Sequence, residues 1–337
     1  MSSGLPDSSR SANASATTYP RMVGDIGGTN ARFAFIAGPG TGLSHIDTLP
    51  AADHAGPAEA IQAWLKRHDL PVPYAAAFGI ANPVSGDAIR MTNHSWAFSI
   101  EAERKKIGLQ AMRFINDFTA LALSLPYLTD EEKHAVGGGQ AMADAAIGVI
   151  GAGTGLGVSG LLKCGNAWVP IAGEGGHVTI STRTDEEAAA VRILSRHYGH
   201  VSAERALSGP GLLALYAALG ELRGQATPFD EAAEISEAAV QGRDALCVDT
   251  CNMFCALLGT AASDLAVTLG ARGGIYIGGG IVPKMGEFFI ASPFRSRFED
   301  KGRFSAYTAA IPTWIITAPY PALTGARVAL QSLDAAA

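Results

Sequence analysis

The sequence predicts an α/β fold of two domains, and three observations indicate it. From Met22 onward, short apolar runs rich in β-branched and aromatic residues alternate with longer runs of helical periodicity. The chain has 337 residues, and 337/150 is about 2.2, which favours two domains with a core each. A segment near residue 22 is repeated in outline near residue 149, about one domain length later.

The strands and helices are expected from the spacing of apolar residues. Strands are predicted at 32–37, 75–81, 113–116, 147–150, 156–163, 274–278 and 314–317. Helices are predicted at 117–125, 184–198 and 211–223, with a long pair over 229–269 that is broken near Gly242.

The repeated segment has one plan in both copies: an apolar strand, a turn rich in Gly and Thr, and a second apolar strand. The copies cover residues 22–36 and 149–162, so they begin about 127 residues apart. This repetition predicts a duplicated α/β unit in which each copy presents a glycine hairpin, with a cleft between the copies.

The charge balance argues against a nucleic-acid partner. The formal net charge is 25 − 31 = −6, and no run of Lys or Arg forms a basic patch. A protein that neutralises a phosphate backbone needs the opposite sign.

The apolar runs predict a soluble protein without a membrane partner. No apolar stretch approaches the roughly 18 residues that cross a bilayer, since the most apolar one, 255–271, contains Asp264. Residues 1–20 are rich in Ser, Ala and Thr and lack the apolar core of a secretory signal, so we expect a disordered tail. A transit peptide would need more arginine than the single Arg10 before Arg21.

Three of the four cysteines are expected to face a core rather than bind a metal. Cys247, Cys251 and Cys255 follow one another every four residues, which places them on one helix face. Zinc sites use closer pairs with a second pair or histidines, and none follow here. Free thiols, with Cys164 the fourth, fit a reducing cytoplasm.

The two glycine-rich turns are predicted to bind phosphate, because a turn without side chains can direct several backbone N–H groups at one anion. The spacing matches neither a P-loop nor a plain dinucleotide fingerprint. Ordinary hairpins remain an alternative for either turn alone. The candidate residues are Gly24, Asp25, Ile26, Gly27, Gly28 and Thr29 in the first turn, Gly153, Thr154 and Gly155 in the second, and Gly278, Gly279 and Gly280 after a later strand.

Asp25 is expected to lie inside the first turn, where a carboxylate beside phosphates would be repelled unless a hard divalent cation stood between them. Magnesium is therefore implied. Thr29 and Thr154 each offer a hydroxyl to a phosphoryl oxygen, and the Gly278–Gly280 run lets a nucleoside approach the backbone.

A set of polar residues suits a polyhydroxylated ligand, because paired amides and carboxylates discriminate strongly for hydroxyls. Taken singly, each has a simpler interpretation: a helix cap for Asp117, a turn former for an asparagine, a surface charge for Glu204. Glu174 and His177 stand in a glycine-rich loop that packing alone does not justify. The candidates are Asn82, Asn93, Asn116, Asp117, Glu174, His177 and Glu204.

Six motifs in order resemble the bacterial glucokinases of the hexokinase and actin-like ATPase superfamily. They span the chain from about Arg21 to Leu333, and they are GDIGGTN (24–30), FINDFTA (114–120), GAGTGLG (151–157), EGGH (174–177), ERALSGPG (204–211) and GGGIVP (278–283). Related kinases and repressors of the superfamily often carry a cysteine-rich zinc motif after the EGGH loop, and it is absent here.

The resemblance implies an actin-like ATPase (ribonuclease H-like) fold with a small α/β domain at 21–127 plus 318–337, closed by a C-terminal helix, and a large one at 128–317. It implies a cytoplasmic homodimer that binds ATP, Mg²⁺ and glucose. The two glycine turns would hold phosphates, Asp25 would organise the metal through water, and Gly278–Gly280 would meet the adenosine. The polar set matches the glucose-binding positions, Asn82 and Asn93 less securely.

The resemblance also implies a reaction, in which the γ-phosphoryl of MgATP passes to the 6-hydroxyl of glucose with Asp117 as general base. We expect an ordinary aspartate pKa near 4 to suffice. The alternatives are a kinase for mannose, N-acetylglucosamine or fructose, a non-catalytic sugar sensor, and an actin-like assembly protein. The spacing does not exclude polyphosphate or ADP as donor.

Overall fold

The computed structural model describes residues 18–334, and the predicted disordered tail lies outside this range except for residues 18–20. The chain folds into two compact units, one with the residues up to Tyr127 and from Tyr320 onward, the other Leu128–Pro319. The first unit contains β1 (Arg21–Ile26), β2 (Asn30–Ile36), β3 (Ser44–Pro50), α2 (Pro57–Arg67), β4 (Ala75–Ile80), β5 (Ala88–Arg90), β6 (Ala97–Ser99), α3 (Ile100–Ile107), β7 (Ala111–Asn116), α4 (Asp117–Ser124) and α14 (Pro321–Asp334).

The second unit consists of the elements between them. They are β8 (Lys133–Ala135), β9 (Ile147–Ala152), β10 (Leu156–Cys164), β11 (Ala167–Ala172), α5 (Asp185–Tyr198), α6 (Ala203–Ala206), α7 (Gly209–Arg223), α8 (Ala232–Val240), α9 (Ala245–Leu269), β12 (Ile275–Gly278), α10 (Val282–Met285), α11 (Glu287–Ala291), α12 (Phe294–Glu299), α13 (Ser305–Ala309) and β13 (Thr313–Ile316).

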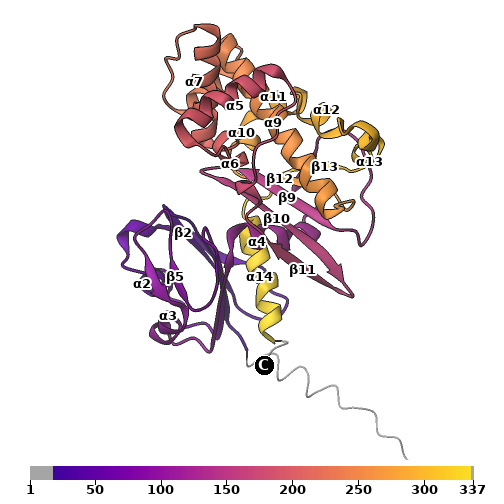
Figure 1. The fold of residues 1–337 in the computed structure, drawn as a ribbon. Helices are drawn as coiled ribbons and strands as arrows, with labels where there is room; N and C mark the ends of the chain where they lie inside the picture. The colour runs from indigo at the N-terminus through magenta and orange to yellow at the C-terminus, as the bar shows by residue number, and fades with distance from the viewer. Residues whose placement is uncertain (1–17, 335–337) are drawn as a thin grey trace, which may run out of the picture. The chain divides into compact units, whose positions relative to one another are not determined.

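The first unit is built on a five-stranded sheet in the order β3-β2-β1-β4-β7, with helices on both faces (Figure 1). β1, β2 and β3 form an antiparallel meander, and β4 and β7 continue the sheet in parallel with β1. Helix α2 packs on α3 and carries Ile61, Trp64 and Leu65 on its buried face. The Trp64 ring lies 5.9 Å from that of Phe33 on β2.

On the other face, α14 packs along α4, as Figure 1 shows. Gly325 makes this close crossing possible, because a Cβ at this position would overlap the carbonyl oxygen of Ala120 on α4. Gly79 on β4 lets α4 approach the sheet, since its Cβ would lie 3.2 Å from the Ala120 Cβ. Small residues thus fix the helix that begins at Asp117 between the sheet and α14.

The second unit repeats this strand order. Its sheet runs β11-β10-β9-β12-β13-β8, and its first five strands have the same sequence of antiparallel and parallel neighbours as those of the first unit. β8 adds an antiparallel edge. The prediction that both glycine-rich turns connect antiparallel strands is confirmed by the β1–β2 and β9–β10 pairs.

Helix α9 forms the core of the second unit, where it contacts α7, α8, α12 and β9. Cys247, Cys251 and Cys255 are buried on it, as predicted, and burial raises the pKa of Cys255 to about 12. By length and composition α9 could cross a membrane, contrary to our expectation that no segment would be apolar enough, but 72% of its most apolar window is buried inside the protein. Such burial is what a core helix shows.

Candidate functional site

Asp117 is the first residue of α4, at the carboxyl end of β7. The cap of this helix is Asn116, whose Oδ1 accepts hydrogen bonds from the N–H groups of Phe118 at 2.9 Å and Thr119 at 3.1 Å. Asn116 therefore supplies the cap that a simpler interpretation assigned to Asp117. The carboxylate of Asp117 is left available for another role.

One oxygen of Asp117 is fixed and the other is open. Oδ1 accepts hydrogen bonds from the N–H of Phe118 at 2.9 Å and from the amide of Asn116 at 3.0 Å. Within residues 18–334, Oδ2 accepts none. Burial, reinforced by the negative charge of Asp25, raises the pKa of Asp117 to about 6, although the Phe118 N–H opposes this. The expectation of an ordinary pKa near 4 is wrong, because it took no account of burial or of a second carboxylate.

Asp25 lies in β1, not inside the first turn as expected. The β1–β2 ladder continues from the pair Asp25 and Arg32 to the pair Ile26 and Ala31, so only 27–29 form the turn. Gly24 is also a strand residue, and it is needed for packing because a Cβ there would lie 2.6 Å from the Phe78 ring. The run of glycines obscured this in the sequence, since glycine suits both a tight turn and a crowded strand.

The carboxylate of Asp25 lies 3.8 Å from a guanidinium nitrogen of Arg32. Burial raises the pKa of Asp25, and Arg32 opposes the shift. Arg32 is itself fixed by Thr48 Oγ1 at 3.1 Å and by the Tyr320 ring at 4.9 Å. Arg32 was not among the predicted site residues, and its only signal in the sequence is its place opposite Asp25 in the hairpin.

These carboxylates fit a hard divalent cation that also binds phosphate. Asp25 and Asp117 are both half-buried, and the pKa of each is raised. Magnesium is typically held by one or two carboxylates and completed by water and phosphate oxygens. Among the residues that the structure describes, no group of three His, Cys, Asp or Glu could hold a metal by itself. The donor set therefore suits an ion that arrives with a phosphorylated ligand.

The first turn exposes backbone groups at its tip. The Gly27 N–H donates to the Asn30 carbonyl at 2.9 Å, while Thr29 is exposed. Gly28 lies against Asn93, since a Cβ on Gly28 would be 2.8 Å from the Asn93 carbonyl oxygen. Asn93 thus abuts the turn with its backbone, and its side chain is exposed.

Asn82 acts within its own turn. Its Oδ1 accepts from both the N–H and the hydroxyl of Thr92, each at 3.0 Å, and its amide donates to the Pro83 carbonyl at 3.0 Å. These bonds match the turn-forming alternative for Asn82. A role in ligand binding would have to use its remaining amide hydrogen.

The second turn, 153–155, connects β9 to β10 and is tied to two helices. The Gly153 N–H donates to the Gly155 carbonyl and the Gly209 N–H to the Gly153 carbonyl, each at 2.8 Å. Oε2 of Glu204 on α6 accepts from the Leu156 N–H at 2.9 Å. Glu204 is therefore half-buried against this turn rather than a surface charge, and Thr154 at the tip is exposed.

Glu174 directly precedes a 3-10 turn, Gly175–His177, of which His177 is the last residue, and both side chains are exposed. Our expectation that packing alone does not justify this glycine-rich loop is wrong. A Cβ on Gly176 would overlap the Leu156 carbonyl oxygen, and one on Gly175 would lie 2.7 Å from Val158. Packing against β10 therefore does explain the two glycines, and it fixes the backbone that carries Glu174 and His177.

The Gly278–Gly280 run begins in β12 and leaves it at Gly279, whose φ is +80°. A Cβ on Gly279 would overlap the Ala152 carbonyl oxygen, and that same oxygen accepts from the Ile281 N–H at 3.2 Å. The run therefore packs directly on the end of β9. In the second unit the structure thus brings the candidate nucleoside turn next to the strand that enters the candidate phosphate turn.

Comparisons with known proteins bear on the whole chain. The glucokinase family model matches residues 22–333. The glucokinase of Aromatoleum aromaticum is 55% identical over 316 residues, which are 94% of this chain and 96% of that protein. The crystal structure of a glucokinase from an Antarctic psychrotroph has 35% identity and a TM-score of 0.85, and the match covers 93% of this chain and 99% of that one.

A more distant structure is that of a ROK family glucokinase from Streptomyces griseus in complex with glucose and AMPPNP. It is 21% identical with a TM-score of 0.61, and the match covers 91% of this chain and 98% of that one. The fold and the two hairpins define an α/β phosphotransferase of the actin-like ATPase fold. The chain belongs to the glucokinase family.

Proposed function

We propose that the protein transfers the γ-phosphoryl group of MgATP to the 6-hydroxyl of glucose, with Asp117 as the general base. Membership of the glucokinase family makes the chain an ATP-dependent hexose kinase. One observation carries the assignment of the base: Oδ1 of Asp117 is held by two hydrogen bonds, while Oδ2 accepts none from the residues that the structure describes. A base must keep its geometry and still offer a lone pair to the substrate.

The sugar would be bound by amides and carboxylates, as a polyhydroxylated ligand requires. We assign this role to Asn116 and Asp117 in the first unit and to Glu174, His177 and Glu204 in the second, with Asn82 and Asn93 contributing at most through exposed atoms.

The nucleotide would be bound by backbone N–H groups of the two hairpin turns. Thr29 and Thr154 are exposed at the tips, so their hydroxyls can reach phosphoryl oxygens. The adenosine would meet the Gly278–Gly280 run, in which Gly279 and Gly280 are exposed and Gly280 has open space in place of a side chain. Asp25 would hold Mg²⁺, through water, and this ion neutralises charge on the phosphates.

Asp117 must be ionised to accept a proton from the sugar. With a pKa of about 6, it is about nine-tenths ionised at pH 7. Phosphoryl transfer has a loose transition state, so alignment of the two oxygens contributes more than the strength of the base. The Asn116 amide and the Phe118 N–H would hold the carboxylate in place while Oδ2 takes the proton late in the transfer.

A coupled assay that measures glucose 6-phosphate tests the function directly. The full chain is supplied with glucose and MgATP, and then with mannose, N-acetylglucosamine and fructose in place of glucose. We expect the highest kcat/KM for glucose. A higher value for another hexose would move the assignment to that sugar, and no turnover on any would favour a sugar sensor.

We further propose a cytoplasmic homodimer. The four cysteines are free, which fits a reducing compartment.

Leu162 and Val169, neighbours across β10 and β11, are each 47% exposed near a sheet edge, where a second copy could cover them. Light scattering on purified protein would give the mass, and a monomer at micromolar concentration would contradict the dimer.

A further inference from the structure

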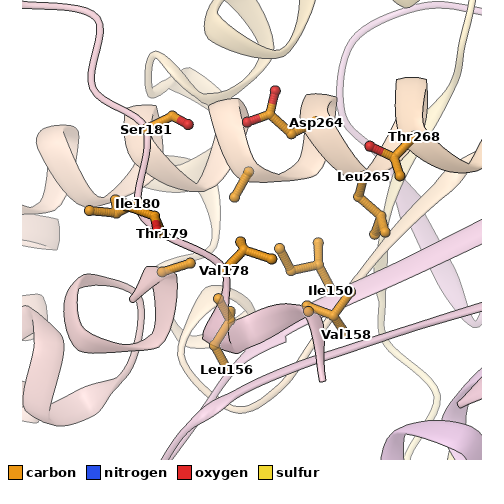
Figure 2. Close-up of a pocket in the computed structure, with 13 residues that line it drawn as sticks. Ile150, Leu156, Val158, Val178, Thr179, Ile180, Ser181, Asp264, Leu265 and Thr268 are labelled. Carbon is orange, nitrogen blue, oxygen red and sulfur yellow. The ribbon is translucent and has the colours of Figure 1, made fainter. Parts of the chain in front are cut away.

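A pocket of about 190 Å³ lies within the second unit, beneath the segment that carries Glu174 and His177. Its walls come from β9, β10, the residues after His177, the start of α6, and α9 (Figure 2). The lining residues are Ile150, Leu156, Val158, Gly175, Val178, Thr179, Ile180, Ser181, Ala203, Ala261, Asp264, Leu265 and Thr268. The assignments made above use none of these side chains.

The lining defines the chemistry of an occupant. Aliphatic side chains make up most of the wall, while the oxygens of Ser181, Asp264 and Thr268 lie around one side (Figure 2). Asp264 is the only charged residue of the lining, and it already accepts a hydrogen bond from Lys301. An apolar cavity of about 150 Å³ accommodates benzene, so this pocket accommodates a somewhat larger ring system. One donor group on that ring would reach a carboxylate or hydroxyl oxygen.

Several residues that line the pocket are adjacent in the chain to the proposed sugar-binding residues. Gly175 follows Glu174, Val178 follows His177, and Ala203 precedes Glu204. The segments are joined to each other, since the Ala203 N–H donates to the Val178 carbonyl at 2.7 Å.

Leu156, also in the lining, donates its N–H to Glu204. Anything that fills the pocket therefore contacts a residue directly adjacent in the chain to each of the three candidate sugar ligands. An occupant would restrain these segments, because side chains around an empty space lack partner atoms on one side.

We propose that this pocket is an effector site for a small, largely apolar ring compound with one hydrogen-bond donor, and that its occupation increases the affinity for the sugar. The coupling rests on the proposed roles of Glu174, His177 and Glu204, whereas the binding itself does not. By linkage, the sugar must increase the affinity for the effector by the same factor.

Indole is a suitable probe, because it has a bicyclic apolar ring and one N–H donor. Its binding to the full-length protein is measured by calorimetry and by saturation-transfer NMR, with and without glucose. The KM for glucose is measured across an indole titration. We expect saturable binding, a decrease of about fivefold in the glucose Kd that is accompanied by a decrease in KM, and the same fivefold decrease in the indole Kd when glucose is present. The kcat should be unchanged.

Ala261→Phe fills the pocket from α9 and should abolish indole binding. Val267→Phe is the matched control, because it adds the same ring to the same helix at a residue that is 38% exposed and outside the lining. If Ala261→Phe does not fold, Thr268→Phe fills the pocket from its exposed side. No indole binding to the unsubstituted protein, or binding that survives both substitutions, overturns the proposal.

The kinase assignment and the effector site fail separately. If Ala261→Phe abolishes indole binding but the unsubstituted protein shows no hexose kinase turnover, the proposed function is wrong and the pocket remains a binding site. Normal glucose turnover with a KM that does not respond to saturating indole would remove the coupling and leave the kinase assignment intact.

Discussion

The side-chain amide of Asn116 donates a 3.0 Å hydrogen bond to Oδ1 of Asp117, the residue that follows it. Asn116 also caps α4 through its own Oδ1, so one side chain both begins the helix and orients the adjacent carboxylate. The position of the proposed base is therefore set by the same interactions that start α4. Substitutions at Asp117 that preserve these interactions separate its chemistry from its structural role.

Asp117→Asn should reduce kcat by several orders of magnitude and change the glucose Kd by less than about fivefold. The amide keeps an oxygen for the Phe118 N–H, so the local structure is retained, but it cannot accept a proton. Single-turnover kinetics and calorimetry with glucose measure the two effects. A variant with near-normal kcat would exclude Asp117 as the base.

The acid side of the pH profile should report the raised pKa of Asp117. We expect kcat/KM to fall tenfold per pH unit below about pH 6, because the protonated carboxyl cannot act as a base. If kcat/KM falls only below about pH 4, the result contradicts the increase in the pKa of Asp117 by burial.

The coupling between the two carboxylates is tested apart from activity. Asp25→Asn removes the neighbouring negative charge and should lower the pKa of Asp117. A carbon NMR titration of the labelled carboxyl groups measures this without turnover. Asp53→Asn, an exposed carboxylate of the same unit, is the matched control and should leave the pKa of Asp117 unchanged.

Asp117→Asn should also stabilise the protein at neutral pH. The pKa of Asp117 is raised from 3.8 to about 6 in the folded state, so its ionised form disfavours folding by up to about 3 kcal/mol above pH 6. The penalty disappears as the pH falls below the unfolded pKa near 4. Denaturant unfolding at pH 8 and pH 3 should show a gain at pH 8 only, and an equal gain at both would point to another cause.

Much of the fold could be predicted from the sequence, because the buried strands and the long helices have strong periodicity. The seven predicted strands correspond to β2, β4, β7, β9, β10, β12 and β13 within a few residues, and the predicted break near Gly242 separates α8 from α9. Short elements such as β8 and α10 to α13 were missed, since three to six residues show too little periodicity to predict them.

The candidate residues could be chosen from the sequence, but their electrostatics could not. The pKa of Asp117 depends on burial by α4 and its neighbours and on Asp25, more than 90 residues away in the chain. Asp25 itself was predicted to lie in the turn, because the glycines around it suit a turn and a strand equally and do not show where the strand ends. The bond from Leu156 to Glu204, 48 residues apart, likewise exists only after folding.

Substitutions of Glu204 and His177 should change the KM of different substrates. Glu204→Ala removes the acceptor for the Leu156 N–H beside the second turn, so KM should rise several-fold for both ATP and glucose. Glu204→Gln keeps an acceptor oxygen and should restore most of the ATP affinity. His177→Ala, in an exposed position away from such a bond, should raise KM for glucose alone. An unchanged ATP KM in Glu204→Ala would remove the proposed support of the turn.

Gly325→Ala should destabilise the protein by at least about 1 kcal/mol, although alanine is favoured over glycine in a helix by about that amount. The added Cβ would overlap the Ala120 carbonyl oxygen, so α14 would have to move away from α4. Gln331→Ala, exposed on the same helix, is the control. Thermal unfolding measures the difference, and a stabilised Gly325→Ala variant would show that the crossing tolerates a side chain.

The crossing of α4 by α14 also orders events during synthesis. The ribosome makes α4 about 200 residues before α14, while the second unit, Leu128–Pro319, is continuous and can fold in the interval. The nascent first unit lacks the helix that covers α4 until nearly all of the described chain has been translated. Until α14 emerges, the face of α4 that it covers, on the helix that begins at the proposed base, would therefore stay exposed in the nascent chain.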